Sequence, residues 1–330
     1  MKAVLSHEPG GPETLSIEEA PAPTAGPGKV VISVKAIGVN FPDSLIIQDL
    51  YQVKPPRPFA PGGELAGEVS EVGEGVTSLS VGDRVLAVPG HGAMVEAIEV
   101  DAKSCIPIPD DMPFDDAACL LLTYATSYYA LKNRAQAKSG ESLFVLGAAG
   151  GVGLAAVQLG KAMGMKVIAG CSNQEKVDLC LDHGAESGIV YPRQPLDRDQ
   201  QKELSGQIKA AGGGGVDVIY DAVGGDYSEP SVRAMNWEGR FLVIGFPAGI
   251  PKLPLNLTLL KNCQVVGVFW GASVVMDPAG HQENVSELFA LYAEGKIKPY
   301  ISSRYSLEQA GDAITELIER RAKGKIVIEI

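Results

Sequence analysis

LFVLGAAGGVG, residues Leu143 to Gly153, joins four apolar residues to a turn of glycine and alanine. The apolar run predicts a short buried strand, and the small-residue segment LAAVQLGKAMG that follows predicts a helix. A strand, a tight glycine turn and a helix in this order present backbone N–H groups and a helix N-terminus to a phosphate. We therefore expect a dinucleotide-binding turn, in which glycine lets the backbone approach the pyrophosphate closely. The residues expected to contact the cofactor here are Ala149, Gly150, Gly151 and Val152.

The motif differs from G-x-G-x-x-G at one position, because Ala148 stands in place of the first glycine when the motif is aligned on Gly150 and Gly153. An imperfect glycine motif can also be an ordinary turn. Its surroundings favour the dinucleotide site, since Gly164 is typical of a helix end and strand-like segments alternate with helical ones after it. Gly153 would also let the helix pack closely on the strand. The six strands expected in this region are Leu143–Leu146, Lys166–Gly170, Ile189–Tyr191, Val216–Tyr220, Phe241–Ile244 and Val265–Phe269.

The segment after the second of these strands indicates which dinucleotide is bound. A site for NAD usually has an acidic residue about 20 residues beyond the glycine turn, on the ribose 2′-hydroxyl. This chain has no acid there, and Ser172 and Lys176 could bind a 2′-phosphate instead. Alternatively, Ser172 and Glu175 form a capping box that opens a helix, with Lys176 as a solvated residue of its first turn. The two interpretations are compatible, and we expect NADPH rather than NADH.

The overall composition is that of an ordinary globular protein with two domains. The chain has 330 residues, of which 45% are hydrophobic and 21% are charged. Its net charge of −12 argues against a nucleic-acid partner, which needs a basic surface. No apolar run reaches membrane-spanning length, and no signal peptide is expected at the start. The five cysteines are scattered and odd in number, which is typical of reduced thiols. We therefore expect a cytoplasmic protein with no membrane partner.

The first 100 residues are β-rich. Short alternating segments broken by glycine and proline predict a small barrel or rolled sheet. The strands expected here are Lys2–Leu5, Leu15–Glu19, Lys29–Val39, Leu65–Val72, Arg84–Val88 and Ala93–Val100.

The rest of the chain fixes the expected domain boundaries. A helical period over Asp110–Ala135 marks the crossing into the dinucleotide-binding domain. Near the end, two amphipathic helices are expected over Glu283–Glu294 and Ser306–Arg321, and the alternating segment Lys325–Ile330 predicts a strand that rejoins the β-rich domain. The fold class is therefore α/β. We expect a β-rich catalytic domain of residues 1–122 and 275–330, and a doubly wound parallel-sheet domain of residues 123–274.

Several motifs are shared with one enzyme family. They are GVNFPD at Gly38–Asp43, PGGELAGEV at Pro61–Val69, VGDRV at Val81–Val85, VDVIYDAVGG at Val216–Gly225, GKIVI at Gly324–Ile328, and the AAGGVG turn. Over essentially its whole length, the chain resembles the zinc-free, zeta-crystallin-like NADPH:quinone oxidoreductases of the medium-chain dehydrogenase/reductase superfamily. The resemblance implies a GroES-like catalytic domain, a Rossmann domain and hydride transfer from NADPH to a quinone. It also implies a homodimer paired through the last Rossmann strand, near residues 265–269.

The resemblance also bears on zinc. Zinc-dependent members of the superfamily carry a cysteine at the position of Asn40 and a histidine at the position of Gly63. The four histidines of this chain are isolated in sequence and no cysteine cluster exists. Catalytic zinc needs three protein ligands, usually nitrogen or sulfur. We therefore expect no metal site and no alcohol oxidation through a Lewis acid.

Without a metal, catalysis needs a hydrogen-bond donor near the oxyanion that develops on the substrate. Asn40 is the first candidate donor, although it could equally be a loop amide that bonds the backbone. Tyr51 matches a tyrosine that the family places in its substrate cleft, and a surface aromatic is the alternative. Asp43 is expected to orient the loop or Asn40 rather than to act as a base, and Glu64 is expected to be structural. Thr126 matches the family's threonine beside the nicotinamide, unless it is a helix threonine that bonds the backbone.

The remaining cofactor contacts follow from the resemblance and from the sheet edge. Tyr191, Lys176 and Arg321 match the family's residues at the adenosine 2′-phosphate, although Arg321 has a solvated charge as its alternative. Gly245 and Phe246 follow the end of an expected strand, where ligands lie in such sheets. Phe246, Phe269 and Trp270 could line the nicotinamide and substrate pocket, although large aromatic residues are usually packing.

Three functions remain open at this point. The first is NADPH:quinone reduction. The second is NADPH-dependent reduction of activated C=C bonds in enones, alkenals or 2-haloacrylates, because that reaction is also a conjugate hydride addition. The third is a non-enzymatic role of the crystallin type, either in NADPH binding or in RNA binding. The net charge of −12 argues against RNA binding.

Overall fold

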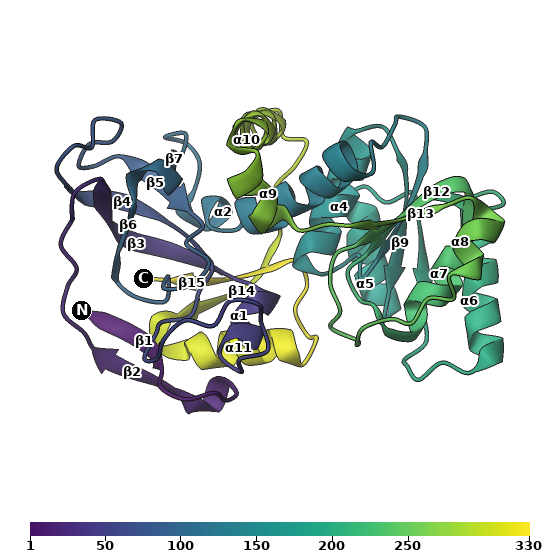
Figure 1. Cartoon of the computed structure of the whole chain (residues 1–330), viewed down its shortest axis with the longest axis horizontal. Helices are drawn as coiled ribbons and strands as arrows, with labels where there is room; N and C mark the ends of the chain where they lie inside the picture. The colour runs from purple at the N-terminus through teal and green to yellow at the C-terminus, as the bar shows by residue number, and fades with distance from the viewer. The chain divides into compact units, whose positions relative to one another are not determined.

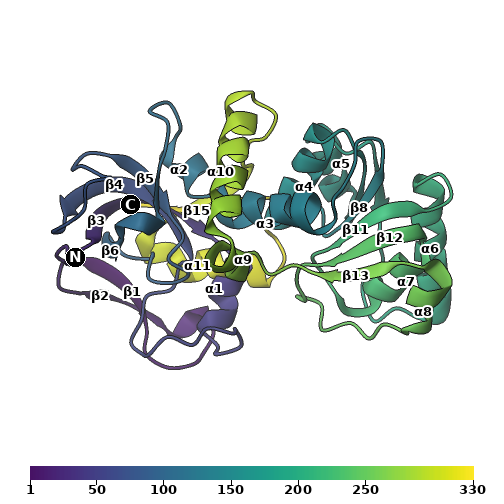
Figure 2. The same cartoon turned by 45° about the horizontal axis from the view of Figure 1, so that its top comes forward.

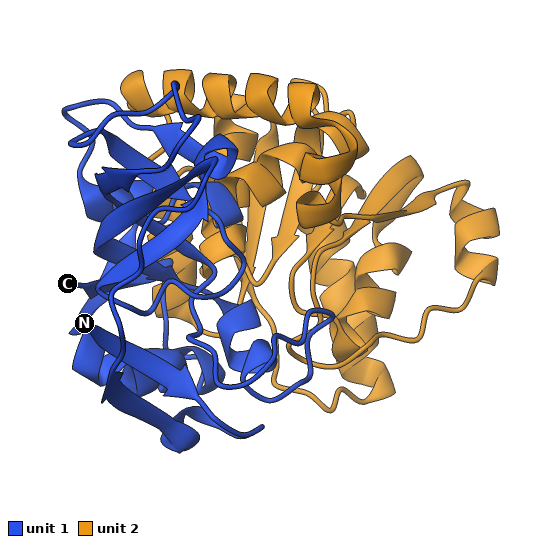
Figure 3. Cartoon of the chain, turned by 60° about the vertical axis from the view of Figure 1, so that its left-hand side comes forward, with its two compact units in different colours: residues 1–122, 299–330 blue, residues 123–298 orange.

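The computed structural model describes residues 1–330, which form two compact units (Figure 3). The first unit contains Met1–Leu122 and Pro299–Ile330, and the second contains Thr123–Lys298. Residues 275–298, which we expected in the β-rich domain, therefore belong to the second unit.

The first unit contains a seven-stranded sheet and a separate pair formed by β1 and β2 (Figure 1). The sheet order is β14-β15-β3-β4-β5-β7, and β6 also pairs with β3. The strands are β1 (Lys2–Ser6), β2 (Leu15–Glu19), β3 (Lys29–Val39), β4 (Glu64–Val72), β5 (Arg84–Ala87), β6 (Ala97–Asp101), β7 (Cys105–Pro107), β14 (Ile301–Ser306) and β15 (Lys325–Glu329). The helices of this unit are α1 (Phe41–Ile46), α2 (Phe114–Ala117) and α11 (Ala310–Ile318).

The long strand β3 carries the core of this unit. One of its edges pairs with β4, and the other is shared by β6 and β15. Ile328 of β15 lies opposite Ile37 of β3 in an antiparallel pairing, and both side chains are fully buried. The prediction that the last strand rejoins the β-rich domain is therefore confirmed.

Several elements of the first unit differ from the expectation. The short helix α1 was not expected, because six residues that include Pro42 show no helical period; proline is tolerated here because it stands in the first turn. The strand β6 begins at Ala97 rather than Ala93, because the N–H groups of Ala93 and Met94 bond to loop carbonyls. The helix α11 ends at Ile318, and the segment before it contains the unexpected strand β14.

The second unit is a doubly wound α/β domain. Its six strands are all parallel in the order β10-β9-β8-β11-β12-β13, which confirms the predicted fold class. The helices α4 and α5 lie on one side of the sheet, and α6, α7 and α8 lie on the other (Figure 2). The strands are β8 (Ser142–Leu146), β9 (Lys166–Cys171), β10 (Ser187–Val190), β11 (Val216–Asp221), β12 (Met235–Val243) and β13 (Gln264–Gly267). The helices are α3 (Thr126–Tyr128), α4 (Gly151–Ala162), α5 (Gln174–Asp182), α6 (Arg198–Ala211), α7 (Ser228–Arg233), α8 (Asn256–Lys261), α9 (Trp270–Met276) and α10 (Pro278–Ala293).

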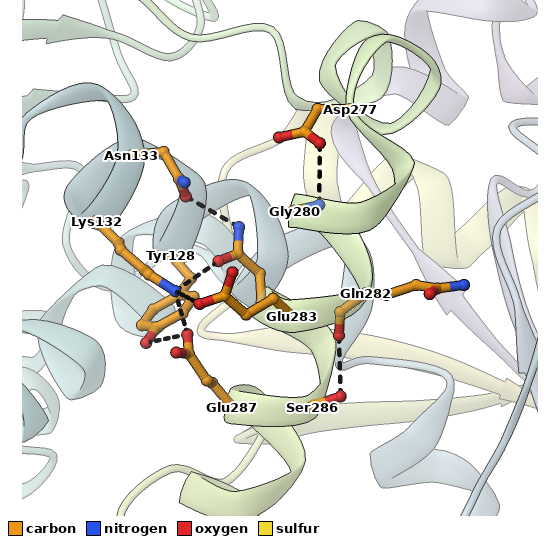
Figure 4. Close-up of polar contacts among 10 residues, drawn as sticks. Tyr128, Lys132, Asn133, Asp277, Gly280, Gln282, Glu283, Ser286 and Glu287 are labelled. Atoms are coloured by element: carbon orange, nitrogen blue, oxygen red, sulfur yellow. Dashed lines mark hydrogen bonds and ion pairs between the residues drawn. The ribbon is translucent and has the colours of Figure 1, made fainter.

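Polar contacts tie α10 to the helical segment around α3, inside the second unit (Figure 4). The Nζ atom of Lys132 lies 3.3 Å from a carboxylate oxygen of Glu283 and also bonds to Glu287. The hydroxyl of Tyr128 donates to the same carboxylate of Glu287 at 2.8 Å. These partners are about 150 residues apart in sequence, so the apolar period of α10 alone could not show which sheet it accompanies.

The last strand of the second unit is shorter than expected. The strand β13 ends at Gly267, so Phe269 and Trp270 stand at the start of α9. We had expected Phe269 to be the last residue of the strand.

Across the whole chain, none of the helices combines the length and apolar character that crossing a membrane requires.

Candidate active site

The glycine turn between β8 and α4 has the geometry of an anion-binding site. Gly147 has a φ of +77°, in the left-handed region that favours glycine. Gly150 is the N-cap residue of α4, so the N–H groups of the first helical turn have no carbonyl partner within the helix. A Cβ atom on Gly153 would lie 2.2 Å from the carbonyl oxygen of Gly147, so only glycine lets the helix approach the turn this closely. The turn therefore exposes backbone donors at the end of a buried strand, which suits a phosphate.

The segment after β9 differs from the capping box that we expected. Asn173 is the N-cap residue of α5, and its side-chain oxygen accepts a hydrogen bond from the N–H of Lys176 at 2.9 Å. The predicted capping box of Ser172 and Glu175 is therefore wrong, because the helix starts one residue later than the serine would require. Ser172 is exposed, and its hydroxyl is not the group that caps the helix.

The residues predicted at the 2′-phosphate in this unit gather at one edge of the sheet. The N–H of Tyr191 bonds to the carbonyl of Cys171 at 2.9 Å, so Tyr191 lies beside Ser172 where the parallel strands end. Its ring packs against Tyr227 with 4.7 Å between the centroids. The pKa of Cys171 is lowered mainly by a bond from Cys180, and the charge of Lys176 lowers it further. Lys176 therefore lies near the same strand end.

Asp221 opens the loop after β11, whose place past a strand end makes it a cofactor-side candidate, but the sequence analysis assigned no role to its carboxylate. One of its carboxylate oxygens accepts the N–H groups of Val223 and Gly224 at 2.9 and 2.8 Å, and the other accepts the hydroxyl of Ser228 at 2.6 Å. Burial raises its pKa above the ordinary value, although these hydrogen bonds oppose the rise. The carboxylate thus fixes the loop after β11. An acid at the end of the apolar run VIYD was the signal that could have indicated it.

Gly245, Phe246, Phe269 and Trp270 all follow the carboxyl ends of parallel strands. The first two come after β12 and the other two after β13. Phe246 is 43% exposed and Phe269 is 60% exposed, so neither ring serves mainly as packing. Trp270 packs edge-on against His281, with 5.7 Å between the ring centroids. The two exposed rings therefore remain candidates for a ligand contact at this edge.

Thr126 lies beside the glycine turn. It opens the short helix α3, which is flanked by wider, π-type helical turns. The hydroxyl of the next residue, Ser127, lies 2.9 Å from the carbonyl oxygen of Val152 in the first turn of α4 and 2.8 Å from the hydroxyl of Tyr220. This anchor places Thr126 next to the expected phosphate-binding turn.

In the first unit, the predicted donor Asn40 is almost completely buried and its amide is already bonded. It is 5% exposed and serves as the N-cap residue of α1. Its Nδ2 atom donates to the carbonyl of Gly38 at 3.0 Å and to the carboxylate of Glu64 at 2.8 Å. Both amide N–H groups are therefore used inside the protein. Asn40 could donate to a substrate only if one of these bonds were released.

Lys325 is the main residue of this cluster that the sequence analysis missed. It is 3% exposed, and its Nζ atom bonds to Glu64 at 2.7 Å, to the side-chain oxygen of Asn40 at 2.6 Å and to the carbonyl of Val39 at 3.1 Å. Glu64 also accepts the N–H of Leu122 at 3.0 Å. The regular alternation of KIVIEI gave no sign that its first residue is buried. A buried lysine is retained when it is paired, as it is here.

Asp43 and Tyr51 complete the polar part of the first unit. Asp43 is 1% exposed and accepts the backbone N–H of Asn40 at 2.7 Å. Burial raises its pKa to about 7, against the opposing effects of that bond and of Lys325. The half-buried Tyr51 packs against the core of this unit, and burial, followed by the nearby Asp43, raises its pKa. Tyr51 therefore keeps its phenol proton at neutral pH.

Arg321 lies in the first unit, just after α11, whereas Ser172, Lys176 and Tyr191 lie in the second. Its side chain is exposed and pairs with Glu319 at 2.6 Å. The structure therefore gathers three of the four residues predicted at the 2′-phosphate, and the role of Arg321 stays a prediction.

Comparison with known proteins identifies the family. Residues 26–110 match the family described as the alcohol dehydrogenase GroES-like domain, and residues 151–294 match the family described as zinc-binding dehydrogenase. The chain is 38% identical to quinone oxidoreductase-like protein 2 homolog of Nematostella vectensis, over 99% of this chain and 88% of that protein. It is 32% identical to the quinone oxidoreductase of Rattus norvegicus, over 99% and 97%.

The chain belongs to the quinone oxidoreductase-like group of the medium-chain dehydrogenase/reductase superfamily. Among solved structures it is similar to Escherichia coli quinone oxidoreductase complexed with NADPH, with a TM-score of 0.89, 31% identity and full coverage of both chains. The chain is thus an oxidoreductase of this superfamily.

The zinc of other superfamily members does not fit the residues present. The two positions that carry zinc ligands in zinc-dependent members hold Asn40 and Gly63 here. The amide of Asn40 is turned toward Gly38, Glu64 and Lys325, and a buried ammonium within 2.6 Å of its oxygen opposes a cation there. No group of three or more His, Cys, Asp or Glu side chains in the chain could hold a metal ion. We therefore derive no step through zinc.

Proposed function

We propose that this protein is an NADPH:quinone reductase, which transfers a hydride from NADPH to a quinone without a metal. The observation that carries the proposal is the pair of substitutions at the zinc-ligand positions, Asn40 and Gly63, in a chain with a phosphate-binding glycine turn. A quinone needs no Lewis acid to accept a hydride, because conjugation spreads the negative charge that develops on it. The names of the relatives, quinone oxidoreductase and quinone oxidoreductase-like protein, support this substrate class.

The second unit would hold the NADPH. When bound, this cofactor supplies the hydride. The first turn of α4 would bind the pyrophosphate through backbone N–H groups, and Ser172, Lys176 and Tyr191 would bind the 2′-phosphate. No carboxylate stands at the end of β9 to repel that phosphate. The residues proposed for the nicotinamide side are Thr126, Gly245, Phe246, Phe269 and Trp270, with Arg321 as a further candidate at the 2′-phosphate.

Tyr51 is the group we assign to the developing oxyanion. Its raised pKa keeps the phenol protonated, so it can donate a hydrogen bond and then a proton to the reduced oxygen. Asp43 lies close enough to raise the pKa of that phenol, and its bond to the N–H of Asn40 supports the orienting role that we assign to it. We assign Asn40 a supporting role as the N-cap residue of α1, because its amide donors are already bonded to Gly38 and Glu64.

A turnover panel tests this proposal. Purified protein with NADPH is offered benzoquinones and naphthoquinones on one side, and enones and alkenals of similar size on the other. We expect kcat/KM to be higher for quinones. A preference for enones would assign the protein to the reductases of activated C=C bonds, and no turnover of any quinone would contradict the proposal.

We further propose a homodimer in which β13 pairs with its copy. β13 is an edge strand of the six-stranded sheet, and Val265 on it is 44% exposed. The neighbouring helix α8 exposes Leu259 at 78% and Leu260 at 64%, and Leu255 just before it is 77% exposed. An edge strand beside exposed apolar side chains is a typical site of association. Light scattering should show that the wild type is a dimer and that Val265→Lys is a monomer. A monomeric wild type would contradict the proposed dimer.

A cytoplasmic location is also part of the proposal. All five cysteines are free, and the sulfur atoms of Cys171 and Cys180 lie 3.7 Å apart without a disulfide. Unbonded neighbouring thiols are typical of a reducing compartment. Fractionation of cells that express the tagged protein would test the location.

A further inference from the structure

Lys325 is a buried ammonium whose donors are all used at the junction between β3 and α1. An ammonium has three N–H groups and no acceptor. They bond to the carbonyl of Val39, the side-chain oxygen of Asn40 and the carboxylate of Glu64, at 3.1, 2.6 and 2.7 Å. Val39 is the last residue of β3, and Asn40 is the N-cap residue of α1. Lys325, on β15, therefore holds both residues of the junction at once.

We propose that Lys325 is a positioning residue for the reduction: it fixes the start of α1, and through this helix it places the hydroxyl of Tyr51. The inference rests on the proposed function, because it assigns Lys325 a role in the reaction for which Tyr51 is the donor. Lys325 itself is buried under Asn40 and Glu64 and acts through them.

Hydrogen bonds hold the first turn of α1 and the turn that precedes Tyr51. The N–H of Asn40 donates to the carboxylate of Asp43 at 2.7 Å, in the first turn of α1. Beyond this helix, which ends at Ile46, the N–H of Leu50 donates back to the carbonyl of Leu45 at 2.9 Å. Tyr51 is the next residue. A shift at Asn40 should therefore reach the tyrosine, because the turn between α1 and Tyr51 is hydrogen-bonded back to the helix.

The chemistry of lysine fits this role better than that of an apolar residue. Because an ammonium only donates, it turns the oxygen of the Asn40 amide toward itself and the nitrogen toward Glu64 and the carbonyl of Gly38. An apolar side chain of the same length would remove the ammonium partner of this amide oxygen and leave the Glu64 carboxylate without a counter-charge in a buried site. The side-chain amide of Asn40 could then flip, and the N-terminal cap of α1 would lose its defined geometry.

The test compares Lys325→Met with Lys325→Arg, which keeps the charge. Lys29→Met is the matched control, because Lys29 is 49% exposed in the same unit and pairs only at the surface with Glu99. Lys325→Met leaves the buried charge of Glu64 without a counter-charge. If this variant does not fold, the double variant Lys325→Met/Glu64→Gln is used in its place.

Two readouts separate positioning from general destabilisation. The first is hydrogen exchange of the protein without cofactor. We expect faster exchange in peptides that cover residues 40–51, and unchanged exchange in the glycine turn at 147–153. The second is kinetic: kcat for a quinone should fall about 10- to 100-fold with a smaller change in KM, since misplacement of a reacting group has costs of this order. NADPH affinity should stay within about twofold, and Lys325→Arg should recover much of kcat.

Several results would overturn the inference. If Lys325→Met leaves both kcat and the hydrogen exchange of residues 40–51 unchanged, Lys325 has no positioning role. Faster exchange throughout the first unit would also overturn the inference, because it would show that Lys325 has a structural role only. A wild type without quinone turnover would instead contradict the proposed function. In that case the exchange data alone decide whether Lys325 fixes α1 and Tyr51.

Discussion

Gly153 and Gly147 lie so close together that a Cβ atom on Gly153 would come within 2.2 Å of the Gly147 carbonyl oxygen. Gly153→Ala should therefore push the first turn of α4 away from the end of β8. We expect a loss of about 1 to 3 kcal/mol in the free energy of unfolding, as for other overpacked sites, and weaker NADPH binding. Denaturant unfolding and fluorescence titration measure the two effects.

A control for this substitution exists in the same unit. Gly206 stands inside α6, and a Cβ atom there would meet nothing within 4 Å. Gly206→Ala should stabilise the protein by about 0.5 to 1 kcal/mol, because alanine loses less backbone entropy in a helix. Equal effects of the two substitutions would contradict the close packing of the turn.

The preference for NADPH over NADH should depend on Lys176. Lys176→Ala removes a positive charge from the edge where Ser172 and Tyr191 lie. We expect NADPH affinity to fall about tenfold, which corresponds to one charge-assisted hydrogen bond, while NADH affinity changes little. Titration of both cofactors against wild type and variant is the measurement. Equal affinities of the wild type for NADPH and NADH would refute the assignment of the 2′-phosphate site.

Tyr51→Phe should lower kcat without affecting the cofactor. A proton donor in the transition state contributes about 100- to 10,000-fold, so a loss near the lower end of this range is expected. Because the pKa of Tyr51 is raised from its ordinary value, the donor form persists at neutral pH and is lost only above pH 10. The rate should therefore show no basic limb from Tyr51 below that pH. A variant with the wild-type kcat would eliminate Tyr51 as the donor.

The buried carboxyl group of Asp43 should make the stability of the protein depend on pH. Its pKa is about 7 in the folded protein, above the ordinary value of 3.8, because burial disfavours the carboxylate. Between these two values the folded state binds more protons than the unfolded state, so the contribution of Asp43 is greatest below pH 3.8 and is lost as the pH rises to about 7. The slope is about 1.4 kcal/mol per pH unit.

Comparison with Asp43→Asn isolates this contribution. The difference in unfolding free energy, wild type minus variant, should fall between pH 4 and 7 and then level off. The other carboxyl groups cancel in the difference, since both proteins contain them. A flat difference would show that Asp43 is ionised at its ordinary pKa.

The local patterns of the sequence predicted much of the fold. The glycine turn, the parallel order of the second unit and the return of Lys325–Glu329 to β3 follow from apolar periods and turn residues. The starting points of elements were less predictable: Asn173 rather than Ser172 caps α5, because two adjacent polar residues can both cap and backbone geometry decides between them.

The candidate site was predictable where it lies on motifs and unpredictable where it depends on long-range packing. Ser172 and Tyr191 lie at strand ends, as their positions in the sequence suggested. Thr126 was expected from the family resemblance, and the bond of its neighbour Ser127 brings it next to the glycine turn. The bond from Lys325 to Asn40 joins residues 285 positions apart, and no local pattern marks it. For the same reason, the commitment of the Asn40 amide to Glu64 could not be seen before the strands were placed.

Metal-independent quinone reduction is decided by one assay: the absorbance of NADPH is followed after a naphthoquinone is added to protein that has been dialysed extensively against a metal chelator. We expect rapid quinone-dependent oxidation of NADPH, much slower oxidation of NADH, and no gain in rate when zinc is added back. No quinone-dependent oxidation, or activity that is lost on chelation and restored by zinc, would contradict it.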